Sequence, residues 1–96
     1  MATSEMRGST VVTLSTSYLG TDYEIRSAKG VEVWLDDATK AFTVRYKTGH
    51  GGDWVERTVA AGGTRYLEGA GSPGKSILLN VKAASATPAA HILPVW

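Results

Sequence analysis

Residues 31–47 read VEVWLDDATKAFTVRYK, and this stretch decides the expected fold. Apolar side chains fall on every second residue at 31–35 and again at 42–47. This period of two is typical of strands that bury one face in a hydrophobic core and turn the other face outward. Residues 36–40 between the two runs are turn formers, so we predict that they form a hairpin loop.

The same alternation extends outward from this stretch. Gly-containing turns are expected at 48–53 and 60–63 and a longer loop at 68–75, because glycine supplies the positive φ angles that such loops need. No long stretch keeps a 3.6-residue period. About seven or eight short strands predict an all-β protein, an antiparallel β-sandwich or a small barrel. The further strand-like runs are at 10–18, 23–27, 55–59, 77–81 and 92–96.

The two ends of the sequence have a different character. Residues 1–8 show no period and predict an extended arm, which leaves 9–96 as a single β domain. Residues 83–96 are nearly uncharged and hold two of the three prolines, so we expect a strap that covers or docks onto another surface. The run at 9–18 carries no charge, and charges are the usual protection of a sheet edge. We expect it in the middle of a sheet or paired with a neighbouring subunit.

Composition narrows the classes of function. The chain has 96 residues, a mass of 10.2 kDa, a formal net charge of +1 and no cysteine. This length fits one domain and excludes the large enzyme folds, and so small a charge does not favour nucleic acid as a partner. Without cysteine there is no disulfide framework or thiolate metal site. The start of the sequence lacks a signal-peptide core and no segment suits a membrane helix, so we expect synthesis in the cytoplasm and no membrane partner.

One string matches a nucleotide-binding motif. Residues 69–76 read GAGSPGKS and fit GxxxxGK[ST], with Gly69, Gly74, Lys75 and Ser76 at the required places. A true phosphate loop joins a parallel strand to a helix, and an acidic residue further on helps to hold magnesium. Here the flanking residues alternate like antiparallel strands, and no Asp or Glu follows Ser76. We interpret the match as coincidental and expect neither a nucleotide nor another cofactor.

The other residues that could carry chemistry are scattered. Asp36 and Asp37 are adjacent in an expected turn, where both face water instead of flanking a substrate. His50 and His91 are far apart in the sequence and have no evident third ligand, so we expect no metal site. No GxSxG elbow provides a serine nucleophile. We therefore expect no catalytic residues and no enzymatic activity.

The tryptophans are more informative. If the valines mark the core, Trp34 and Trp54 lie on the outer side of their strands. Indoles anchor protein interfaces, form platforms for sugars or fill a core, and these alternatives stay open for both residues. As the candidate interface we select large apolar side chains on the outer side of strands or near the ends, namely Trp34, Trp54, Trp96, Met6, Leu93 and Val95.

The order of these parts carries a resemblance. The sequence runs through VEVWL at 31–35, FTVRY at 42–46, AAGGT at 60–64, ILLNV at 77–81 and LPVW at 93–96. It resembles the small β-sandwich virion proteins of tailed bacteriophages, which include capsid decoration (cement) proteins and other minor head proteins. The resemblance lies in the general character and the order of the strands, turns and loops, and no functional residue can be assigned from it.

The resemblance implies a function. It suggests a non-enzymatic structural protein that binds the capsid surface and bridges neighbouring capsomers, in a virion formed after synthesis in the host cytoplasm. The implied partners are the major capsid protein or other virion subunits, and such proteins often act as homo-oligomers, including trimers. Two alternatives remain: a carbohydrate-binding module or lectin-like domain with Trp34 and Trp54 as stacking platforms, and a phage tail or connector component of similar fold.

Overall fold

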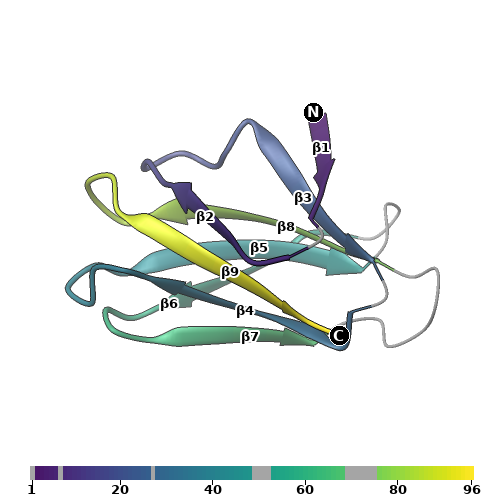
Figure 1. Ribbon diagram of the computed structural model, residues 1–96. Coiled ribbons are helices and arrows are strands. Elements are labelled where there is room, and N and C mark those ends of the chain that lie inside the picture. The colour runs from purple at the N-terminus through teal and green to yellow at the C-terminus, as the bar shows by residue number, and fades with distance from the viewer. Residues whose placement is uncertain (1, 7, 27, 49–52, 69–75) are drawn as a thin grey trace.

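Nine strands form two sheets in the computed structural model, which describes residues 2–6, 8–26, 28–48, 53–68 and 76–96 (Figure 1). No helix occurs in these described ranges, and the predicted all-β sandwich is confirmed. The strands are β1 (Ala2–Glu5), β2 (Thr10–Thr13), β3 (Thr21–Arg26), β4 (Gly30–Leu35), β5 (Phe42–Thr48), β6 (Val55–Val59), β7 (Thr64–Glu68), β8 (Ser76–Ala83) and β9 (Ala89–Val95).

The strand order is that of a jelly roll with one added strand. The five-stranded sheet has the order β1-β3-β8-β5-β6, and the four-stranded sheet has the order β2-β9-β4-β7. Strands β2 to β9 pair as nested antiparallel ribbons: β2 with β9, β3 with β8, β4 with β7, and β5 with β6. Rolling up such a long hairpin sends successive ribbons to alternate sheets, which produces this fold. The added strand β1 is parallel to β3.

The predicted hairpin at residues 36–40 is wrong. Strand β4 lies in the four-stranded sheet and β5 in the five-stranded sheet, so the loop crosses from one sheet to the other. The local turn is real, because Asp37 Oδ1 accepts hydrogen bonds from the Thr39 backbone N–H at 2.9 Å and from its hydroxyl at 2.6 Å. A turn fixes the bend of the chain. It does not determine whether the two strands pair with each other or face each other across the core.

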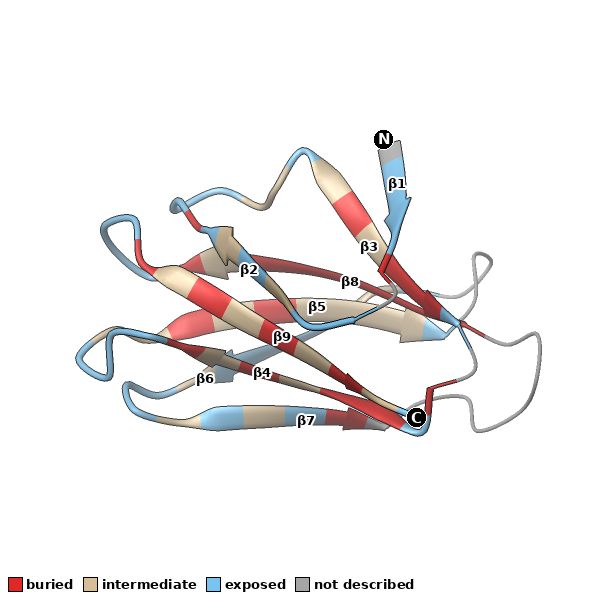
Figure 2. Ribbon diagram, viewed as in Figure 1, coloured by how far each residue is buried: buried red, intermediate tan, exposed pale blue. Residues whose placement is uncertain are grey.

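Inward-facing side chains of both sheets form one core. Figure 2 shows buried residues on strands of both sheets. The alternation predicted at 31–35 and 42–46 is confirmed by the burial of Val31, Val33, Phe42 and Val44. Strand β8 is buried along almost its whole length because it lies in the middle of its sheet and its outer side is also covered. Its apolar run follows from burial on both sides.

Both terminal segments belong to the sheets. Residues 2–6 do not form an arm that leaves the domain, because β1 pairs with β3 and the Met6 N–H donates to the Glu24 carbonyl at 2.8 Å. The expected strap at 83–96 contains β9, an interior strand between β2 and β4. Pro94 is tolerated in β9 because its nitrogen is directed to the β2 side, beyond Ile92, where the pairing of β2 has ended.

Candidate functional site

The outer face of the four-stranded sheet carries a group of large apolar side chains around Glu32. Paired residues of antiparallel strands lie on the same face, so the strand register shows which side chains are neighbours. One row holds Val11, His91 and Trp34, and the next row holds Leu93, Glu32 and Tyr66, so the charged Glu32 lies between two of the large apolar side chains. We call this surface the apolar face and define it by Val11, Trp34, Tyr66, His91, Leu93 and Val95.

Large hydrophobic groups on the apolar face are open to solvent. Val11 is 58% exposed and Tyr66 is 45% exposed, whereas Trp34, Leu93 and Val95 are half-buried. These side chains come from all four strands of the sheet and share one face, which Glu32 interrupts between Leu93 and Tyr66. Exposed apolar and aromatic side chains that gather on one face are a feature of sites that contact another molecule.

The indole of Trp34 is held in place by His91. The two rings are stacked with 5.1 Å between their centroids and 4° between their planes. The His91 Nε2 contacts Asp36 Oδ1 at the end of β4, which fixes the imidazole from its other side. Asp36 is exposed, as expected for a turn residue, and it also orients this pair. His50 lies outside the described residues.

The Tyr66 ring packs against Gly30 of the neighbouring strand β4. A Cβ atom at Gly30 would lie 2.1 Å from the Tyr66 hydroxyl oxygen and 2.2 Å from Cζ. Because Gly30 has no side chain, the phenol ring approaches the β4 backbone closely. Placing an aromatic ring over a glycine on an adjacent strand is a known way of covering that position in a sheet.

The outer face of the five-stranded sheet has the opposite chemistry. Its central row runs from β3 to β6 as Asp22, Asn80, Arg45 and Glu56. We call this surface the charged face and define it by Tyr18, Asp22, Arg45, Lys47, Trp54, Glu56, Asn80 and Lys82.

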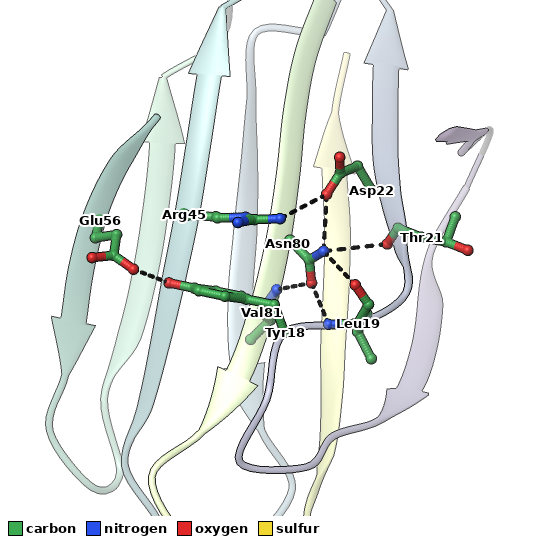
Figure 3. A network of polar contacts seen from close by, with 8 residues as sticks. All are labelled: Tyr18, Leu19, Thr21, Asp22, Arg45, Glu56, Asn80 and Val81. Carbon is green, nitrogen blue, oxygen red and sulfur yellow. Dashed lines mark hydrogen bonds and ion pairs between the residues drawn. The ribbon is translucent and has the colours of Figure 1, made fainter. Parts of the chain in front are cut away.

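Asn80 is the centre of a polar network on the charged face (Figure 3). Its side chain is fully buried. The amide accepts from the Leu19 N–H and donates to the Leu19 carbonyl, both at 2.8 Å, as a backbone peptide of an adjacent strand would. It also donates to Asp22 Oδ1 at 2.9 Å, and Arg45 pairs with that same oxygen at 3.4 Å. The amide therefore ties the loop before β3 to β8.

Aromatic rings and cations alternate across the charged face. The Arg45 guanidinium lies 4.4 Å from the centroid of Tyr18 and 4.6 Å from that of Trp54. Lys82 stands 4.7 Å from the Tyr18 ring, and Lys47 stands 4.7 Å from the Trp54 ring. Such contacts stabilise cations over the electron-rich ring faces. The aromatic rings of this face are therefore already occupied by cations of the same chain.

The hydroxyl of Tyr18 closes the network on its other side. It donates to Glu56 Oε2 at 2.5 Å (Figure 3). Burial, followed by this hydrogen bond and the charge of Glu56, raises the pKa of Tyr18 to about 12. The phenol therefore stays protonated and donates throughout the neutral range.

The predicted interface residues are placed in different environments. Trp34, Leu93 and Val95 lie on the apolar face. Trp96 follows β9, is 52% exposed, and donates from its indole nitrogen to the Arg26 carbonyl at 3.0 Å. Met6 is only 4% exposed and packs in the core, which corrects its assignment to the interface.

Trp34 and Trp54 lie on opposite outer faces of the sandwich. Trp34 is on the four-stranded sheet, whereas Trp54 contacts Arg45 and Lys47 on the outside of the five-stranded sheet. Both indoles are half-buried, so neither is a fully buried core residue and neither is fully exposed. They cannot form one stacking platform for a single sugar chain.

Three members of the apolar face were not among the predicted interface residues, namely Val11, Tyr66 and His91. The uncharged run around Val11 pointed to a surface to be covered, but not to this side chain. Tyr66 belongs to β7, whose five residues TRYLE did not predict a strand. His91 was considered only as a metal ligand, and its stacking on Trp34 follows from the pairing of β4 with β9.

The phosphate-loop string is not completed by a helix. Gly69, Gly74 and Lys75 lie outside the described residues, and Ser76 is the buried first residue of strand β8. Among the described residues there is no pocket and no group of three or more His, Asp or Glu side chains that could hold a metal ion. No helix in the described ranges is long and apolar enough to cross a membrane.

Comparisons with family models, with curated proteins and with solved structures find no match for this chain.

Proposed function

We propose that the chain is a non-enzymatic structural protein of a virion, a capsid decoration protein that docks its apolar face on capsid subunits. The observation that carries the proposal is the exposure of Val11 and Tyr66 on the same sheet face as Trp34. Interfaces are enriched in aromatic anchors at their centre, and an apolar surface gains free energy when a partner excludes water from it.

The architecture supports the same proposal. Jelly rolls of two sheets are common in viral capsid proteins and in lectins, so the fold alone does not distinguish these classes. The placement of Trp34 and Trp54 on opposite faces removes the specific platform on which the sugar-binding alternative rested. A flat apolar face fits the surface of a protein shell better than a single small molecule.

The test is co-sedimentation with assembled particles. The chain is produced together with the major capsid protein encoded in the same genome, and particles are separated from free protein by ultracentrifugation. The unaltered chain is expected to co-sediment with the particles. Tyr66→Asp should reduce the bound fraction by about tenfold or more, because a carboxylate at the interface must lose its water.

A matched variant controls for the added charge. Thr58→Asp places the same carboxylate at an exposed position of β6, on the outside of the five-stranded sheet, and should bind particles as the unaltered chain does. Equal losses for both variants would remove the apolar face as the docking surface. Failure of the unaltered chain to co-sediment would overturn the capsid proposal, and binding to a glycan panel instead would move the function to carbohydrate recognition.

A further inference from the structure

The four edge strands of the sandwich are protected to different degrees. Strands β1 and β6 border the five-stranded sheet, and β2 and β7 border the four-stranded sheet. Charged residues are present on three of these strands: Glu5 on β1, Glu56 and Arg57 on β6, and Arg65 on β7. Charges of this kind discourage pairing with another chain.

Arg65 protects β7 in a specific way. It is paired with Val33, whose side chain is fully buried, so Arg65 is on the inward side of the edge strand. An inward-pointing charge on an edge strand is one of the devices that prevent a further strand from being added. Strand β2 has no such device, because residues 8–20 contain no charged residue and no proline.

The backbone of β2 has hydrogen-bonding groups directed away from its sheet. The Leu14 N–H donates to the Pro88 carbonyl, so Leu14 is directed toward β9. Direction alternates along a strand, so Thr10 and Val12 are also directed toward β9. The N–H and C=O groups of Val11 and Thr13 are therefore directed to the open edge, where both side chains are exposed.

We infer that β2 is a self-association edge, and that its partner is β2 of a second copy of this chain. Antiparallel pairing about a two-fold axis at Val12 sets Val11 of each copy opposite Thr13 of the other. Both of these pairs can exchange two hydrogen bonds, which gives about four in all. A two-fold interface must be complementary to itself, and an edge without charge meets this condition because no like charges are brought together.

The pairing would join two apolar faces into one. Val11 is the apolar-face residue on β2, so the two-fold axis adds the second face directly beside the first. The result is a continuous sheet of two four-stranded halves with both apolar faces on the same side. Sheets extended through an exposed edge in this way are a recurrent mode of protein association. The inference does not depend on the identity of the surface that the apolar face contacts.

The first test is the molar mass of the purified chain alone, measured by light scattering at protein concentrations up to about 1 mM, since edge pairing alone is a small interface. We expect a concentration-dependent mass that approaches twice the chain mass of 10.2 kDa. Val11→Lys and Thr13→Lys should each weaken association by about tenfold or more, because an edge lysine opposes strand addition. Circular dichroism checks that both variants fold.

Thr64→Lys is the matched control. It puts the same charge on an exposed residue of β7, the opposite edge of the same sheet, and should leave association unchanged. A monomer at all concentrations would overturn the inference. So would a trimer, or a dimer that Val11→Lys and Thr13→Lys do not weaken.

A second test fixes the register through cysteine cross-linking, which is clean here because the chain has no cysteine. In the proposed register, Val11→Cys in one chain and Thr13→Cys in another bring two Cα atoms to about 5.5 Å, within reach of a disulfide. A mixture of the two variants should form a covalent dimer under oxidation, and either variant alone should form far less. Equal cross-linking in all three samples, or none in the mixture, would overturn this register.

Discussion

The two outer faces cover the same core but differ in how their side chains are satisfied. On the charged face, the loop before β3 folds back, and Asn80, Asp22, Arg45 and Tyr18 satisfy one another within the chain. On the apolar face, Trp34 is stacked on His91, whereas Val11 is 58% exposed. Polar side chains on the charged face stabilise the fold, whereas exposed apolar side chains on the apolar face are accessible to another molecule.

A strong polar network is not by itself evidence of a functional site. A buried amide without partners costs free energy, so the polar groups of the charged face are kept together by the fold itself. An exposed valine or tyrosine costs little in the isolated chain, and its burial becomes favourable only when a second surface arrives.

The largest effect on the free energy of unfolding is expected from a substitution at the centre of the charged face. Asn80→Leu keeps a similar volume but leaves the Leu19 N–H and carbonyl and one side of Asp22 without their partner. Each abandoned buried group costs about 1–3 kcal/mol, so we expect a loss of about 3 kcal/mol or more in the free energy of unfolding, measured in urea. Thr64→Val on an exposed edge is the control and should stay within about 0.5 kcal/mol. A cost for Asn80→Leu as small as the control would contradict a structural role for this network.

A smaller loss is expected when the cation of the network is removed. Arg45→Met keeps an apolar stem and loses the ion pair with Asp22 and the contacts with the rings of Tyr18 and Trp54. We expect a cost of about 1–2 kcal/mol. Urea unfolding with and without 1 M salt should show that part of this cost is screened (Debye length about 3 Å at that salt). An unchanged urea midpoint for Arg45→Met would mean that Arg45 does not help to hold the loop before β3 in place.

A still smaller effect on stability is expected on the apolar face. Gly30→Ala displaces the Tyr66 ring from its contact with residue 30, but the ring is partly exposed and can move. We expect a cost of about 1 kcal/mol in unfolding free energy, as for a modest packing change. In a Tyr66→Ser background the same substitution should cost much less, which a double-mutant cycle measures. Additive costs would show that the ring and the glycine are not in contact.

The smallest expected effect is a pH dependence of the free energy of unfolding that comes from Tyr18. Its pKa is about 12 in the folded chain and 10.0 in the unfolded reference. A folded pKa raised above the unfolded one gives stability that is present below pH 10 and is lost as the pH rises toward 12. Because this group is largely solvated, the contribution is expected to stay below about 1 kcal/mol.

The measurement compares the unaltered chain with Tyr18→Phe. Free energies of unfolding are determined for both at pH 9 and pH 11. The unaltered chain should lose more stability between these two pH values than the variant. Equal losses would assign the pH dependence to other groups.

Much of the secondary structure could be read from side-chain alternation, but its pairing could not. The period of two in 31–35 and 42–47 predicted β4 and β5, and residues 55–59 were predicted as the strand that β6 forms. Strands β1 and β7 were missed because β1 (ATSE) has no large apolar side chain and β7 has a charge, Arg65, at an inward position, so neither shows apolar alternation. The turn at Asp37 was foreseen, but which strands it joined in space was not.

Part of the candidate site was foreseen in the same limited way. Alternation placed Trp34 and Trp54 on outer faces, and the structure puts both there. Alternation cannot say which sheet a face belongs to, so the separation of the two indoles and the row from Val11 to Trp34 required the register of three strands. Met6 was assigned to a surface because it lies in the aperiodic segment 1–8, although the pairing of β1 with β3 carries it into the core.

The amino-acid sequence by itself determined that this protein is all β, which side chains of most strands face inward, and where several of the turns lie. These properties depend on neighbours in the chain and on the two-residue period of a strand. Tertiary structure alone decided the jelly-roll pairing, the closure of one face by Asn80 and the openness of the other. Those outcomes depend on contacts between residues far apart in the sequence, such as Leu19 with Asn80 and Val11 with His91, which local patterns do not specify.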